Sequence, residues 1–75
     1  MKILVVEDDQ LLNTTLCYNL SAAGYEVDAA LTKGIAENLC EKQEYDLIVL
    51  DINLPDGNGF DFCRELKDSH PDTAV

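Results

Sequence analysis

Hydrophobic residues follow two kinds of pattern along the chain, and together these predict alternating strands and helices. Short apolar runs at 3–6 and 47–50 are typical of strands buried on both faces, as in a parallel sheet. Residues 25–29 alternate apolar with polar side chains, which favours an edge strand with one face in water. The predicted strands are 2–6, 25–29 and 46–50, and the predicted helices are 9–23, 33–43 and 59–68.

The helical segments carry apolar residues three and four positions apart, which marks the side expected to face the sheet. In the first helix, buried positions are expected at Leu12, Leu16 and Leu20, widened by Leu11, Thr15 and Ala23. In the second they are expected at Ile35, Ala36, Leu39 and Cys40, and in the third at Phe60, Cys63 and Leu66 or nearby positions. Gly24 fits the left-handed position that ends a helix, and Thr32 and Asn58 fit N-caps. Consecutive strand–helix–strand units predict an α/β fold, a parallel sheet with helices on both faces, and residues 73–75 are expected to begin a fourth strand.

Acidic residues directly follow two of the predicted strands, at the sheet edge where open α/β folds bind ligands. Glu7, Asp8 and Asp9 come after the first strand, and Asp51 comes after the third. If these strands are parallel neighbours, Asp8 and Asp51 meet at one edge, and each close pair of carboxylates repels by roughly 4 kcal/mol at an intermediate dielectric. Because a divalent cation relieves this repulsion, the sequence predicts a Mg²⁺ site.

Length and charge restrict the functions open to this chain. Its 75 residues form one domain at most, and the net charge of −10 argues against direct binding of nucleic acid, which needs Lys and Arg. Neither a signal peptide nor a membrane span is expected, because the apolar stretches are too short. Cys17, Cys40 and Cys63 lack metal-ligand spacing and fit small core residues of a reduced, cytoplasmic protein.

The loop after the third predicted strand makes the acidic pattern more specific. Residues 51–59 read DINLPDGNG, with Asn53 two positions and Pro55 four positions after Asp51, and a glycine eight positions after it. Combined with an acidic pair at 7–8 and the strand–helix order, this pattern resembles the receiver domain of two-component response regulators. The resemblance runs through the whole chain.

The resemblance implies a flavodoxin-like (CheY-like) α/β fold with strand order 2-1-3, in which residues 1–75 form the N-terminal part of a receiver domain. Asp51 is then the phosphoacceptor for a sensor histidine kinase. Asp8 and Asp51 each give an oxygen to Mg²⁺, the carbonyl of Asn53 gives a third, and Glu7 acts mostly through a metal-bound water. The module is a signalling domain rather than an enzyme, and its parent is expected to be a transcriptional regulator.

Other interpretations of these residues stay open. Asp51 could serve as a helix cap or a solubility residue, and the chain could be a non-phosphorylated structural or interaction fragment. A haloacid dehalogenase-like phosphohydrolase also uses a strand-end Asp with Mg²⁺, but it needs a second Asp where this chain has Asn53. The hydroxyl residue of the family's fourth strand and the lysine of its fifth are absent, and the uncovered apolar faces predict self-association.

Several residues receive expectations of lesser weight. Asp9 is read as an N-terminal helix residue favoured by the helix dipole, Asp56 as a solvated turn residue, and His70 as a surface residue. All five aromatic side chains are expected to be buried or half-buried. Because the family's kinase contacts lie largely on the first helix, the resemblance offers as candidate contacts Asn13, Thr14, Cys17 and Tyr18.

Overall fold

A computed structural model describes residues 1–51, 53–54, 56–70 and 72–74, with the backbone alone for 53–54 and 57–58. The elements are β1 (Lys2–Val6), α1 (Gln10–Ala22), β2 (Glu26–Ala30), α2 (Lys33–Lys42), β3 (Leu47–Leu50), β4 (Asn53–Leu54), β5 (Gly57–Asn58) and α3 (Gly59–Ser69). Each helix and each strand of the main sheet lies within one or two residues of its predicted range. Only β2 is displaced as a whole, by one residue.

The main sheet has the strand order β2-β1-β3, and all of its pairs are parallel. This confirms the predicted α/β fold and the position of β2 at an edge. On the outer side of β3, Ala74 forms a parallel bridge with Leu47, and the amide of Ile48 donates to the Ala74 carbonyl at 2.8 Å. This single bridge lies within residues 73–75, where a fourth strand was expected, and that strand stays a prediction. The antiparallel pair β4–β5 lies in a segment that was predicted as a loop.

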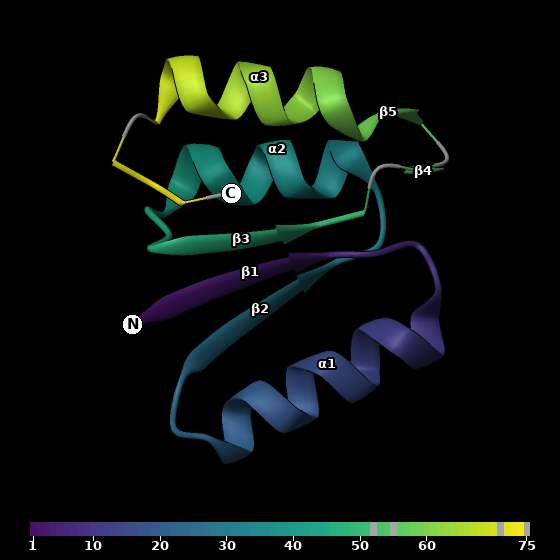
Figure 1. Ribbon diagram of the computed structural model, residues 1–75, viewed down its shortest axis with the longest axis vertical. Coiled ribbons are helices and arrows are strands. Elements are labelled where there is room, and N and C mark those ends of the chain that lie inside the picture. Colours follow the sequence, from purple (N-terminus) through teal and green to yellow (C-terminus); the bar gives the residue numbers. More distant parts are fainter. Residues whose placement is uncertain (52, 55, 71, 75) are drawn as a thin grey trace.

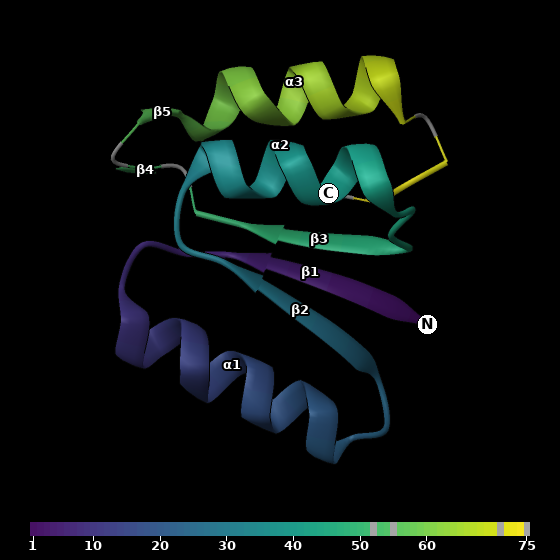
Figure 2. The ribbon, with the colours of Figure 1, turned by 180° about the vertical axis from the view of Figure 1, so that it is seen from behind.

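The helices cover the sheet unequally. Figures 1 and 2 show α1 alone on one face and α2 and α3 layered on the other. The core lies between the sheet and the α2–α3 layer, and it consists of Leu4, Val6, Ala30, Ala36, Cys40, Tyr45, Ile48, Phe62 and Leu66. On the α1 face, Ile3 and Val5 are buried, whereas Val49 of β3 is 37% exposed. The side of the sheet that carries α1 is therefore only partly covered in the described part of the chain.

Local capping explains why the helix ends were predictable. Asp9 is the N-cap of α1, where its side chain accepts from the Leu12 amide at 3.1 Å, and Thr32 caps α2 in the same way. Gly24 follows α1 with a φ of 98°, and the amides of Gly24 and Tyr25 bond back into the last turn of the helix. This is the left-handed C-terminal motif that glycine adopts without strain. The side chain of Asn58, the predicted N-cap of α3, lies outside the described part of the structure, so this cap stays a prediction.

Several predicted burials were wrong. In α1 the buried residue is Asn13, whereas Leu11 is 77% and Leu12 is 45% exposed. In α3 the ring of Phe62 is buried and Phe60 is 65% exposed, because Phe62 lies on the same helix face as Leu66 and Phe60 lies on the opposite one. Among the other aromatic residues, Tyr18 and Tyr25 are also exposed.

Asp28 departs in part from the expectation that one face of β2 is in water, because its carboxylate has two protein partners. The hydroxyl of Tyr45 donates to its carboxylate at 2.7 Å, and Lys2 forms an ion pair with it at 3.8 Å. Burial, followed by this hydrogen bond to a carboxylate, raises the pKa of Tyr45. Contacts from β1 and from the segment before β3 thus partly cover Asp28, whereas Glu26 on the same strand is exposed.

No helix in the described part of the chain is long and apolar enough to span a membrane. The three cysteines are free thiols, of which Cys40 is buried.

Candidate metal centre

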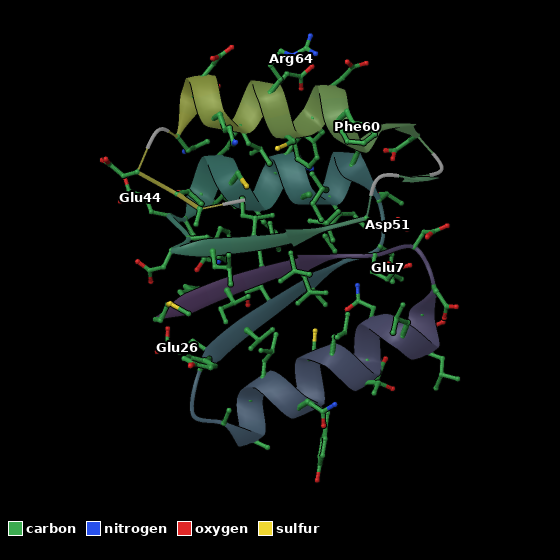
Figure 3. All side chains as sticks on the ribbon, viewed as in Figure 1. Glu7, Glu26, Glu44, Asp51, Phe60 and Arg64 are labelled. Carbon is green, nitrogen blue, oxygen red and sulfur yellow. The ribbon has the colours of Figure 1, made fainter. Side chains whose placement is uncertain are left out.

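The carboxyl ends of β1 and β3 bring the acidic residues of two distant segments together. Val6 pairs with Leu50 in the sheet, and the amide of Asp51 donates to the Val6 carbonyl at 2.9 Å. Carboxylate oxygens of Glu7, Asp8 and Asp51 all lie within 4.8 Å of one another. Figure 3 shows Glu7 and Asp51 at the same edge of the sheet. We call these three side chains the acidic triangle.

The environment of Glu7 disfavours a negative charge on its carboxyl group. Burial raises the pKa of its carboxyl, and repulsion from Asp51 and contact with Asp8 raise it further. The Asp9 amide opposes this shift by donating to the Glu7 carboxylate at 3.1 Å. The triangle therefore concentrates negative charge that a cation would stabilise.

The donor set fits Mg²⁺. All three side chains offer carboxylate oxygens, the ligands that this hard cation prefers. Asp8 is exposed, and Glu7 and Asp51 are half-buried, so the site is open to the water molecules that Mg²⁺ retains. The structure thus assembles three of the four predicted ligand residues. Asn53 begins β4 two residues after Asp51, its side chain lies outside the described part, and the role of its carbonyl stays a prediction.

Asn13 supports this edge of the sheet, which the sequence analysis missed. It is 2% exposed, and its side-chain amide donates to the carbonyls of Glu7 at 3.0 Å and Ala30 at 3.1 Å. The expectation that Asn13 contacts a kinase is wrong, because a buried side chain is not available to a partner. The sequence did contain a signal for this burial, because Asn13 lies among the apolar residues of the first helix that were expected to face the sheet.

Asp56 is an exposed turn residue, as predicted, and it has a role that the sequence analysis missed. Its two carboxylate oxygens accept from the amides of Lys33 at 2.8 Å and Gly34 at 2.9 Å, at the start of α2. These two bonds lower the pKa of Asp56. Orphan amides at a helix N-terminus attract a carboxylate. The loop that follows Asp51 is therefore tied to α2, whereas Pro55 in the same loop lies outside the described part.

Comparison with known proteins identifies this arrangement. The family model of the response regulator receiver domain matches residues 3–75. The chain belongs to this family. As a receiver, it is part of a class of two-component signalling modules, and this membership favours the receiver interpretation over the phosphohydrolase one.

Sequence relatives of this receiver are transcriptional regulators. The phosphate regulon transcriptional regulatory protein PhoB of Rhizobium meliloti (strain 1021) is 43% identical over 72 residues, which cover 96% of this chain and 31% of PhoB. The alkaline phosphatase synthesis transcriptional regulatory protein PhoP of Bacillus subtilis (strain 168) is 42% identical over 66 residues, 88% of this chain and 28% of PhoP. The chain thus spans about a third of the length of these relatives.

Solved receiver structures share the fold. The non-phosphorylated HemR receiver domain of Leptospira biflexa is 45% identical with a TM-score of 0.88, and the match covers 95% of this chain and 57% of that one. The response regulator TrrA of Thermotoga maritima, described in complex with Mg²⁺-BeF, is 32% identical with a TM-score of 0.90 over 96% of this chain and 63% of that one.

Proposed function

We propose that this receiver accepts a phosphoryl group on Asp51 in a reaction that depends on Mg²⁺ bound at the acidic triangle. The observation that carries the proposal is the convergence of Glu7, Asp8 and Asp51 within 4.8 Å at one sheet edge. The Mg²⁺-BeF complex of the similar receiver TrrA supports the choice of ion. Residues 1–75 are then the N-terminal part of a receiver domain.

The side chains divide the chemistry among themselves. An oxygen of the Asp51 carboxylate attacks the phosphorus of a phosphohistidine, the bond from phosphorus to the histidine nitrogen breaks, and an acyl phosphate forms on Asp51. Asp8 and Asp51 would hold the ion directly, the Asn53 carbonyl would add a third oxygen, and Glu7 would act through a water. When bound, Mg²⁺ neutralises the phosphoryl oxygens, which lets the negatively charged group approach three carboxylates.

The proposed partner is a sensor histidine kinase, and the proposed parent is a transcriptional regulator, as in the relatives. The net charge of −10 makes direct contact with DNA by this chain unfavourable. The remaining kinase-contact candidates on α1 are Thr14, Cys17 and Tyr18, of which Tyr18 is 74% exposed.

We also propose that this chain associates with a second copy of itself. Leu11 and Leu12 on α1 and Val49 on β3 are exposed in the described structure. Burial of such apolar surface against a second copy is favourable, at about 25 cal/mol per Å². Light scattering over a range of concentrations is expected to show the mass rising above that of a monomer, and a constant monomer mass would refute this part.

The test is the intact mass of the chain after incubation with a small acyl phosphate. The mass of one added phosphoryl group is expected with Mg²⁺ and not with a chelator. Asp51→Asn should gain none, whereas Asp61→Asn, which removes an exposed carboxylate on α3, should behave like the wild type. Absence of added mass on every chain would favour a module that keeps the fold without being phosphorylated.

A further inference from the structure

Asn13 occupies an unusual place for a polar side chain. It is the one buried polar residue in the ranges that the structure describes, and it lies on α1 where the helix passes the carboxyl ends of β1 and β2. A buried amide is costly unless its hydrogen bonds are satisfied. Its partners therefore show what this residue does.

The side-chain amide makes a set of contacts that fixes its orientation. Nδ2 lies 3.0 Å from the Glu7 oxygen, 3.1 Å from the Ala30 oxygen and 3.5 Å from the Val5 oxygen, so its two hydrogens serve the two shorter contacts. Oδ1 accepts from the Cys17 thiol at 3.2 Å. A reversed amide would place an oxygen against three carbonyl oxygens, so this assignment is the favourable one.

The contact with Glu7 bears on the acidic triangle. The Glu7 amide donates to the Ala30 carbonyl at 3.1 Å, while the Glu7 carbonyl accepts from Asn13. The peptide groups on both sides of the Glu7 Cα are therefore held, one by β2 and the other by α1. Since the Glu7 carbonyl belongs to the peptide that links Glu7 to Asp8, this anchoring holds the backbone from which both side chains extend.

We propose that Asn13 is a positioning residue for cation binding: it fixes the backbone at Glu7 and Asp8 so that their carboxylates meet Asp51 in one ligand set. This inference rests on the proposed Mg²⁺ site. Partners of this kind, which orient ligands without touching the ion, typically contribute about 10- to 100-fold to metal affinity. The thiol of Cys17 completes the hydrogen bonding of Asn13 and does not contact the triangle.

A purely structural role makes a different prediction. Loss of Asn13 leaves buried carbonyls without a donor, which destabilises the fold whatever the function. A matched control is Leu66→Ala, because Leu66 is 4% exposed in α3 and packs in the opposite layer of the core. It destabilises the fold without touching the triangle or its support.

The experiment is calorimetric titration of the full chain with Mg²⁺, at a temperature where far-ultraviolet circular dichroism shows each variant folded. For Asn13→Ala the dissociation constant should rise about tenfold or more. For Leu66→Ala it should stay within about twofold of the wild type, because that residue shares no partner with the site. If Asn13→Ala does not fold, Asn13→Leu, which fills the space without a donor, takes its place.

The outcomes separate this inference from the function on which it rests. An unchanged dissociation constant in a folded Asn13 variant, or an equal loss in Leu66→Ala, would overturn the positioning role while leaving the Mg²⁺ site intact. A wild-type chain that does not bind Mg²⁺ would overturn the proposed function as well.

Discussion

Replacing Asp51 by Asn should stabilise the metal-free protein and abolish most of its response to Mg²⁺. The substitution preserves the shape of the side chain and removes one of three negative charges from the acidic triangle. Two repulsive pairs disappear with it, Asp51 with Glu7 and Asp51 with Asp8. The same loss of charge removes an ion ligand, so stability and ion binding should change in opposite directions.

The size of this stabilisation follows from the distance between the carboxylate oxygens of the acidic triangle. Two unit charges at the upper limit of 4.8 Å repel by about 0.9 kcal/mol with the screening of bulk water and by about 3.5 kcal/mol at an effective dielectric of 20, and closer charges repel more strongly. Asp8 is exposed and the other two residues are half-buried, so the lower figure applies to each pair. Two pairs give about 2 kcal/mol, which shifts a urea midpoint by about 1–2 M when m is about 1–2 kcal/mol/M. Saturation with Mg²⁺ at a hundred times its dissociation constant should stabilise the wild type by about 2.7 kcal/mol.

The assay is urea unfolding with and without Mg²⁺, followed by far-ultraviolet circular dichroism. The matched control is Glu26→Gln, which changes the net charge equally at the start of β2, away from the triangle in Figure 3. Without Mg²⁺ the Asp51→Asn midpoint should lie above that of the wild type, and with Mg²⁺ the difference should close or reverse. An Asp51→Asn chain that is no more stable than Glu26→Gln without the ion, or that responds to Mg²⁺ like the wild type, would refute the reasoning.

Three further predictions test other parts of the structure. Phe62→Ala should lower the free energy of unfolding by about 3–5 kcal/mol, measured by chemical denaturation, because the ring is buried. Phe60→Ala should lower it by less than about 1 kcal/mol, and equal losses would contradict the assigned buried face of α3. The raised pKa of Glu7 means that the folded state holds the proton of this carboxyl more tightly than the unfolded state does. The free energy of unfolding of the metal-free protein should therefore fall as pH rises above the ordinary pKa of 4.5. Glu7→Gln should flatten this part of a stability–pH profile, and an unaltered slope would count against the shift. Asp56→Ala should speed hydrogen exchange at the first two amides of α2, measured by NMR, and unchanged protection would show that they have another acceptor.

The features that depend on local sequence were predictable. The apolar runs at 3–6 and 47–50 indicated strands buried on both faces. Gly24 and Thr32 carried the capping signals for the end of α1 and the start of α2. The acidic triangle was predictable for a similar reason. Parallel strands end at the same edge, so residues that directly follow two neighbouring strands must approach one another.

Apart from the local β4–β5 pair, what the sequence did not show depends on contacts between distant segments. Phe60 and Phe62 both fit a helical spacing, and only the packing of α3 against the core decides between them. Asp56 finds its partners 22 and 23 residues away, at the start of α2. Asn13 is satisfied by carbonyls of two strands, which no pattern within α1 could show. The residues that support the site were therefore harder to predict than the residues that form it.

Asp51 as the phosphoryl acceptor is the central claim, and locating the modification tests it most directly. The chain is phosphorylated with a small acyl phosphate and Mg²⁺, reduced with borohydride to convert an aspartyl phosphate to homoserine, and mapped by peptide mass spectrometry. The account predicts homoserine at position 51 and at no other carboxylate. Modification at Asp8 or Asp56, or none at position 51 in a chain that has gained the mass of a phosphoryl group, would contradict it.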